Sequence, residues 1–170
     1  MQVAPQSPGL SGVEIQIGAA IGVGPTGLAA FDSALRQIGA ADRNLVRLSS
    51  VIPPGSKILQ VDELESRGLW GDRLYCVYAE QRTQRPGEEA WAGVAWVQDS
   101  STGQGLFVEH EGASRVQVEA DLDDTLEAMC LGRSFLPDIS GRVVVGAVCE
   151  SQPISALVVA SFAAEPWRRG

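Results

Sequence analysis

Alternating apolar and polar residues mark a series of predicted β-strands along the chain. Val13, Ile15 and Ile17 alternate with polar residues, and the glycines that begin at Gly22 end this segment. Further apolar or β-branched stretches that favour strands occupy 44–52, 74–81, 90–98, 105–111, 142–149 and 154–164. Because short turns join the three middle stretches, 74–81, 90–98 and 105–111, we expect them to form an antiparallel meander. The segment 55–71 is predicted to be an irregular connection.

Two segments instead repeat their apolar residues at helical spacing. Thr26 can cap a helix that runs to about Ile38, and Gly39 is its stop signal. Ser114 opens a capping-box pattern for a second helix that ends before Gly132. Since the helices do not alternate regularly with the strands, the order of elements favours an α+β fold with layered sheets over a doubly wound fold.

Small residues are frequent in two of the predicted strands, at 90–95 and 160–164. Small side chains let two sheets approach closely, which is compatible with layered sheets. The glycine-rich segment 22–27 also fits a GxGxxG pattern, but no acidic residue ends the next strand, as a dinucleotide site would require. A turn that leads into an amphipathic helix explains these glycines better.

Length and charge limit the possible partners. The chain has 170 residues and a net charge of −8, which argues against nucleic acid or an anionic membrane as a partner. The longest uncharged run, 15–31, is short and interrupted by Pro25, so no membrane span is predicted. We expect a flexible tail at 1–12, without the features of a signal peptide, followed by a single domain at 13–170.

The residue types that bind cofactors are scarce. His110 is the single histidine, which excludes a multi-histidine metal site, and a pyridoxal phosphate Schiff base would need the single lysine, Lys57. Three cysteines lie far apart among apolar residues, so we expect buried, reduced thiols and a cytoplasmic protein. The acidic stretch 119–124 is predicted to be a solvated helix face rather than a metal site.

Ser49 and Ser50 stand between two apolar runs and ahead of a proline pair. Adjacent serines at the end of a strand usually only satisfy local hydrogen bonds. A serine beside a strained peptide can also attack the preceding carbonyl, and elimination from the resulting ester cuts the chain and leaves a pyruvoyl group. That reaction needs a rigid turn and a donor for the carbonyl oxygen. Asn44 lies about 20 Å from Ser50 on an extended strand, so its help requires the chain to fold back or a neighbouring subunit.

The segment Asn44-Leu45-Val46-Arg47-Leu48-Ser49-Ser50-Val51-Ile52-Pro53-Pro54 resembles the pyruvoyl-dependent arginine decarboxylases. Phe31-Asp32-Ser33-Ala34-Leu35 before it and Val108-Glu109-His110-Glu111-Gly112 after it add to the resemblance, which covers about 13–132. The resemblance implies a four-layer α/β/β/α sandwich with closely packed antiparallel or mixed sheets. It also implies a homotrimer of αβ units, or a multiple of it, with active sites between subunits.

The family resemblance further implies self-cleavage between Ser49 and Ser50, into a β chain of residues 1–49 and an α chain of residues 50–170. The enzyme would convert L-arginine to agmatine and CO₂ through a Schiff base to the pyruvoyl group formed from Ser50, with neither pyridoxal phosphate nor a metal. Polyamine synthesis or acid resistance would use the product. Asn44 would assist processing or binding.

The same resemblance implies a role for two carboxylates, and each of them also has an interpretation that needs no active site. Glu109 would donate the proton to the carbanion, and its apolar strand can raise the pKa of the carboxyl, although an exposed strand-end carboxylate has the same sequence pattern. Asp32 would hold the guanidinium of the substrate. Its alternative is a solvated helix carboxylate paired with Arg36, four residues later. His110 should point to the face opposite Glu109 and have a structural or surface role.

Two other functions remain open at this point. The same chemistry could act on another amino acid, such as histidine. The chain could also be an uncleaved, non-enzymatic trimeric homologue that works as a scaffold or regulator.

Overall fold

A computed structural model describes residues 12–65 and 68–167 of the chain. The predicted N-terminal tail, apart from its last residue, lies outside the described residues. The elements follow in the order β1 (Glu14–Val23), α1 (Gly27–Gln37), β2 (Asn44–Arg47), β3 (Val51–Ile52), β4 (Lys57–Gln60), β5 (Arg73–Thr83), β6 (Glu89–Gln98), β7 (Gly105–Gly112), α2 (Arg115–Cys130), β8 (Ile139–Val148) and β9 (Ile154–Glu165).

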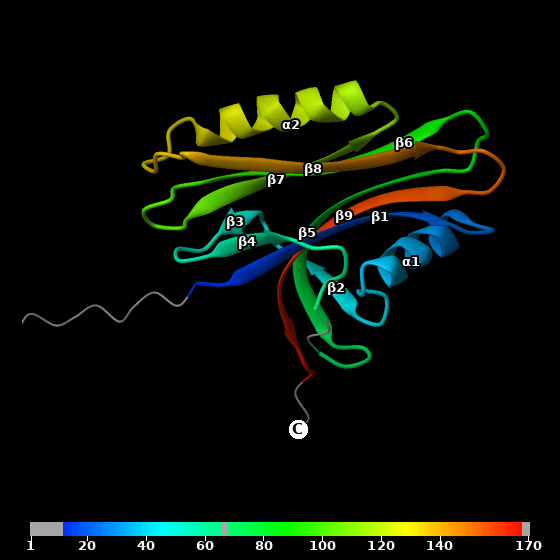
Figure 1. The fold of residues 1–170 in the computed structure, drawn as a ribbon, viewed down its shortest axis with the longest axis horizontal. Coiled ribbons are helices and arrows are strands. Elements are labelled where there is room, and N and C mark those ends of the chain that lie inside the picture. Colours follow the sequence, from blue (N-terminus) through cyan, green and yellow to red (C-terminus); the bar gives the residue numbers. More distant parts are fainter. Residues whose placement is uncertain (1–11, 66–67, 168–170) are drawn as a thin grey trace, which may run out of the picture.

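The strands form two sheets that lie face to face (Figure 1). The five-stranded sheet has the order β2-β5-β9-β1-β4, and the four-stranded sheet has the order β3-β7-β6-β8. Two pairs, β1 with β4 and β2 with β5, are parallel, and the other pairs are antiparallel. The five-stranded sheet is therefore mixed, and the four-stranded sheet is antiparallel.

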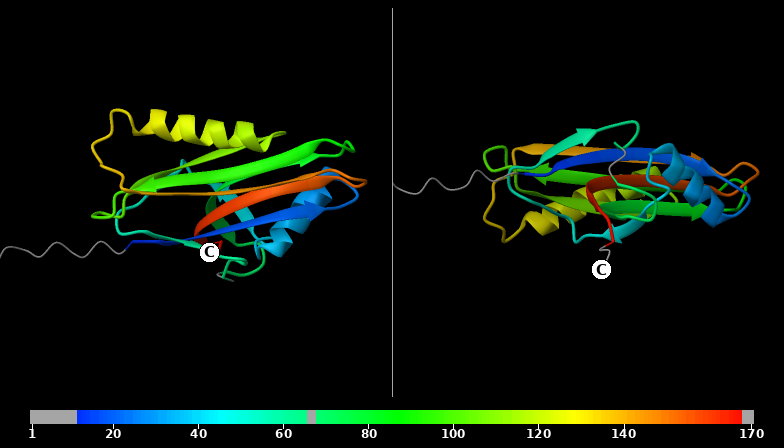
Figure 2. Two further views of the ribbon diagram at one scale, coloured as in Figure 1. Left: turned by 45° about the horizontal axis from the view of Figure 1, so that its top comes forward. Right: turned by 90° about the horizontal axis from the view of Figure 1, so that it is seen from below.

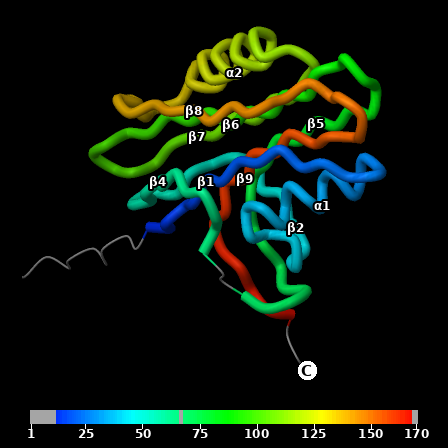
Figure 3. Tube along the Cα trace, turned by 45° about the vertical axis from the view of Figure 1, so that its right-hand side comes forward, coloured from blue at the N-terminus to red at the C-terminus, as the bar shows by residue number. Residues whose placement is uncertain are grey.

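One helix covers the outer face of each sheet, which gives four layers (Figures 1 and 2). Helix α1 packs on β1, β9 and β5, whereas α2 packs on β7, β6 and β8. Figure 3 shows α1 and β2 together on the side of the molecule that faces away from α2. The fold is the α+β sandwich that the sequence predicts. Among the described residues, neither helix has the length and apolar character needed to cross a bilayer.

Small side chains fill much of the core between the sheets. Ala90 and Ala92 of β6 and Ala156 and Ala160 of β9 are fully buried in this core, together with the larger Phe107. Contacts between β6 and β9 connect the two sheets directly. The prediction that strands rich in small residues let the sheets approach closely is therefore confirmed.

The helix boundaries follow local capping signals. Thr26 Oγ1 accepts a hydrogen bond from the Ala29 amide at 3.1 Å, and Gly39 has a positive φ of 76° after the last turn. Ser114 Oγ accepts from the Gln117 amide at 3.5 Å at the start of α2. Both helices begin at the residue after their predicted cap. The sequence could indicate these starts because each capping bond joins residues three positions apart.

Three expectations about the strands were wrong. The run 44–52 is not one strand but two, and β2 and β3 belong to different sheets. The stretches 74–81, 90–98 and 105–111 do not form a single meander, because β5 lies in the five-stranded sheet and only β6 and β7 are neighbours. The segment 55–71 is not wholly irregular, since β4 pairs with β1. In each case the actual pairing partner of the strand is distant in sequence, so the local pattern could not indicate it.

The glycine-rich turn at 22–27 is explained by helix packing. A Cβ added at Gly22 would lie 1.9 Å from the Ala30 carbonyl oxygen of α1. Only glycine lets β1 and α1 approach this closely, which agrees with a turn that leads into an amphipathic helix.

Candidate active site

Ser50 lies where the chain passes from one sheet to the other. Strand β2 ends at Arg47 in the five-stranded sheet, and β3 begins at Val51 in the four-stranded sheet. Ser50 has φ of 68°, and it is the one non-glycine residue with positive φ in the part of the chain that the structure describes. For an L-residue this conformation costs about 1–2 kcal/mol and persists only where the surroundings impose it.

Hydrogen bonds hold the chain on both sides of the Ser49–Ser50 peptide bond. Before it, the Leu48 amide donates to the Cys76 carbonyl of β5 at 2.9 Å. After it, the Ser50 carbonyl accepts from the Phe107 amide of β7 at 2.8 Å. Hydrogen bonds to both sheets therefore hold this peptide, as expected of the rigid turn that the sequence analysis calls for.

The Ser50 side chain meets the predicted proton donor. Its hydroxyl donates to the Glu109 carboxylate, with 2.6 Å between Oγ and Oε1. Glu109 belongs to β7, where it shares the inward face with the buried Phe107. His110 lies on the opposite face and its Nε2 is 2.7 Å from Thr125 Oγ1 of α2, as expected for a structural histidine.

Burial raises the pKa of the Glu109 carboxyl, because desolvation penalises its charged form. The Ser50 hydroxyl and the positive charge of Arg47 oppose this rise, as does His110 to a smaller extent. The carboxyl is half-buried. It can therefore serve as a proton acceptor for Ser50 in one state and as a proton donor in the other.

Asp32 and Asn44 lie elsewhere in the single chain. Asp32 is exposed on α1 and pairs with Arg36, 3.1 Å from Arg36 Nε to Asp32 Oδ2. This is the alternative that the sequence leaves open for a helix carboxylate. The Asn44 side chain donates to the Gly71 carbonyl at 2.8 Å. Neither of these polar contacts involves Ser50. Among the described residues, a side-chain contact within one chain therefore joins Ser50 to Glu109 but not to Asp32 or Asn44.

Two residues near Ser50 escape the sequence analysis. Arg47 Nη2 donates to the Tyr78 carbonyl at 2.9 Å, and its guanidinium lies 4.1 Å from the centre of the Tyr78 ring. A single arginine in a short strand carries no periodic signal. It lies in the segment that carries the family resemblance, three residues before Ser50, but nothing in that pattern assigns it a role.

A cavity of about 480 Å³ adjoins the segment that follows Ser50. Its lining includes Val51, Pro53, Pro54, Arg133 and Phe135. Ser50 and Glu109 are not among its lining residues, so the cavity lies beside the Ser50 turn rather than around it.

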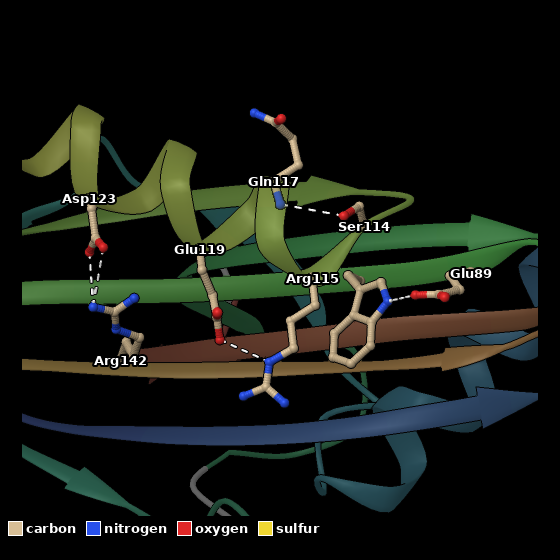
Figure 4. A network of polar contacts seen from close by, with 8 residues as sticks. Glu89, Ser114, Arg115, Gln117, Glu119, Asp123 and Arg142 are labelled. Carbon is tan, nitrogen blue, oxygen red and sulfur yellow. Dashed lines mark hydrogen bonds and ion pairs between the residues drawn. The ribbon is translucent and has the colours of Figure 1, made fainter.

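A larger hollow of about 630 Å³ lies at the other edge of the sandwich, beside β1 and β8. There the α2 side chains form ion pairs: Arg115 with Glu119 at 2.9 Å, and Asp123 with Arg142 at 3.0 Å (Figure 4). Ser50 and Glu109 do not line this hollow, whereas the smaller cavity is lined by Val51, the residue that follows Ser50. In residues 12–65 and 68–167, no group of three His, Cys, Asp or Glu side chains is arranged to bind a metal ion.

Comparison with known proteins shows which family the chain belongs to. The family model of the pyruvoyl-dependent arginine decarboxylases matches residues 14–160. Relatives that carry this family name include proteins from Halobacterium salinarum (40% identical over 95 residues, 56% of this chain and 58% of that protein) and Methanothermobacter thermautotrophicus (37% over 92 residues, 54% and 57%). The match to the Methanococcoides burtonii relative is 32% identical over 123 residues, or 69% of this chain and 68% of that protein.

The chain thus spans less than two thirds of the first two relatives, and both the Ser50 turn and Glu109 fall within the span of the family match. The match covers every strand and both helices except the end of β9. The chain belongs to the pyruvoyl-dependent arginine decarboxylase family.

Proposed function

We propose that the chain cleaves itself between Ser49 and Ser50 and then decarboxylates L-arginine to agmatine and CO₂. The observation that carries this proposal is the 2.6 Å hydrogen bond from Ser50 Oγ to Glu109 Oε1, at a turn with a left-handed backbone. Membership of the family supports the pyruvoyl chemistry, and the name of the relatives supports arginine as the substrate.

Self-processing begins when Ser50 Oγ adds to the carbonyl carbon of Ser49 and its proton passes to Glu109. The bond from that carbon to the Ser50 nitrogen then breaks, the nitrogen takes up a proton, and an ester replaces the amide. Loss of the Ser50 α-proton breaks the bond from Cβ to Oγ, which releases Ser49 as a carboxylate and leaves dehydroalanine. Water then displaces ammonia and leaves a pyruvoyl group at position 50, without any oxidant.

The local structure favours the first of these steps. Cleavage relieves the left-handed conformation of Ser50, which costs about 1–2 kcal/mol in the intact chain. The two sheets keep the hydroxyl next to its proton acceptor while the bond breaks. The same turn therefore raises the free energy of the intact chain and positions the nucleophilic hydroxyl.

In the decarboxylation step, the pyruvoyl group supplies an electron-accepting carbonyl next to the α-carbon of the substrate. Glu109 remains next to position 50, and burial favours its protonated form. This carboxyl would hold the proton that the α-carbon needs after CO₂ has left. Asp32 would accept the guanidinium of arginine in a bidentate pair, because a carboxylate matches its planar fork of donors.

A trimer of αβ units would complete the site. In one chain Asp32 contacts Arg36 and Asn44 contacts Gly71, so their proposed roles are best met from a neighbouring subunit. We further propose a cytoplasmic location, which the three unpaired cysteines Cys76, Cys130 and Cys149 support. Neither nucleic acid nor a membrane is part of the proposal.

Release of CO₂ from labelled substrates tests this function. The processed protein should release CO₂ from L-arginine and not from L-histidine, and Ser50→Ala should abolish both self-cleavage and release. Release of CO₂ from histidine alone would show that arginine is not the substrate. A cleaved protein that releases CO₂ from neither would contradict it.

A further inference from the structure

The hydrogen bonds between β2 and β5 follow a regular series. The Asn44 amide donates to the Asp72 carbonyl at 2.8 Å, and the Leu48 amide donates to the Cys76 carbonyl at 2.9 Å. In a parallel pair the donors and acceptors both advance by two residues. The next bond in this series would join the Ser50 amide to the Tyr78 carbonyl.

A side chain takes that carbonyl instead. Arg47 is the last residue of β2, and its Nη2 donates to Tyr78 O at 2.9 Å. The guanidinium also lies 4.1 Å from the centre of the Tyr78 ring, a contact that fixes its orientation. The Ser50 residue has meanwhile turned away with φ of 68°, and its own carbonyl is bonded to Phe107 in the other sheet.

We propose that Arg47 is a positioning residue that ends β2 by occupying the Tyr78 carbonyl and so keeps Ser50 in the turn where the chain is cut. The effect on cleavage rests on the proposed function, whereas the effect on the backbone of residue 50 does not. Without the guanidinium, Ser50 gains a ladder acceptor and leaves the left-handed region. Both changes favour a continued strand over the reactive turn.

The charge of Arg47 acts in the same direction. Its positive charge lowers the pKa of the Glu109 carboxyl, against the burial that raises it. A lower pKa favours the ionised carboxylate, which is the form that can accept the Ser50 proton. The groups that act on this carboxyl are Ser50, Arg47 and His110. Of these, His110 points toward Thr125 of α2 and belongs to the opposite face of the strand.

Amide hydrogen exchange at position 50 tests the backbone claim in an uncleavable Ser50→Ala background. Adding Arg47→Met should slow exchange of this amide by tenfold or more, because it joins the ladder. Arg47→Lys keeps a cation that can donate to the Tyr78 carbonyl. The exchange rate of the residue 50 amide should then stay nearer to that of the Ser50→Ala parent. The control is Arg82→Met, which removes a positive charge from β5 that pairs with Glu80 instead.

Equal exchange rates with and without Arg47→Met would overturn the proposal, whether or not the natural chain cleaves itself. In the chain that retains Ser50, Arg47→Met should slow self-cleavage by fivefold or more and Arg47→Lys should restore part of the rate. The melting temperatures of these variants should stay close together. If exchange slows while cleavage keeps its parent rate, the role of Arg47 in processing is wrong.

Discussion

Ser50 Oγ and Glu109 Oε1 lie 2.6 Å apart although 59 residues separate them in sequence. One side chain comes from the crossing between the sheets and the other from the inward face of β7. The pairing of Val51 with Leu106 sets the register that brings them together. A nucleophile and a titratable carboxyl in contact, at a strained turn, are the parts that self-cleavage needs.

Replacement of Glu109 by Gln should slow self-cleavage by about 10² or more, because the amide cannot accept the Ser50 proton. The same hydroxyl can still form a hydrogen bond to the Gln oxygen, so the turn is expected to persist. A time course of the two fragments on a denaturing gel measures the rate. Cleavage at the parent rate would move the proton acceptor to another group.

The stability of the fold should depend on pH through Glu109. A carboxyl whose pKa is raised by folding binds more protons in the native than in the unfolded state between the two pKa values. The free energy of unfolding therefore falls as pH rises through this interval. In the uncleavable Ser50→Ala background, Glu109→Gln should be the more stable protein at neutral pH.

That advantage should vanish below about pH 4, where the carboxyl is protonated in both states. Urea denaturation at a series of pH values measures the difference between the two variants. A constant difference across the whole range would show that burial does not perturb this carboxyl.

Asp32→Asn should raise KM for arginine by about tenfold or more, because the amide loses the charge-assisted pair with the guanidinium. Self-cleavage should continue at the parent rate. The exposed ion pair of Asp32 with Arg36 is worth only about 0.3–0.5 kcal/mol, so a substrate can displace it.

The matched control is Arg36→Met, which frees Asp32 and should lower KM by no more than about twofold. Steady-state kinetics on both variants measure the effects. An unchanged KM in Asp32→Asn would remove this residue from substrate binding.

Gly146→Ala should destabilise the fold by about 1–3 kcal/mol, because overpacking forces neighbouring groups to shift. The added Cβ would lie 2.1 Å from the Trp91 ring, which is itself held by Glu89 at 2.5 Å and lies against Arg115.

Gly112→Ala serves as the control for this prediction, since its nearest contact would be Val118 at an ordinary 3.5 Å. Its effect should stay within about 0.5 kcal/mol. Urea unfolding of both variants in the Ser50→Ala background gives the comparison, and equal stabilities would contradict the packing argument.

Sequence patterns predicted those features whose causes are local. Thr26 and Ser114 cap their helices through bonds to residues three positions later, so the start of each helix could be read directly. The opposite directions of Glu109 and His110 follow from the alternation of a strand. The resemblance of the segment 44–54 to one family pointed to the same family as the comparisons do.

Features that depend on the tertiary fold could not be predicted. The apolar run 44–52 contains no sign that its two halves join different sheets, because both halves need the same residue types. The left-handed backbone of Ser50 is imposed by bonds to β5 and β7, and the role of Arg47 depends on the register with Tyr78. Each of these is set by partners more than 20 residues away in the sequence.

Intact mass spectrometry of the purified, freshly denatured protein tests the central claim most directly. We expect two chains that meet at the Ser49–Ser50 bond, the larger one beginning with a pyruvoyl group that reacts with hydrazine and blocks Edman degradation. A single chain of 170 residues with an ordinary serine at position 50, after prolonged incubation, would contradict it.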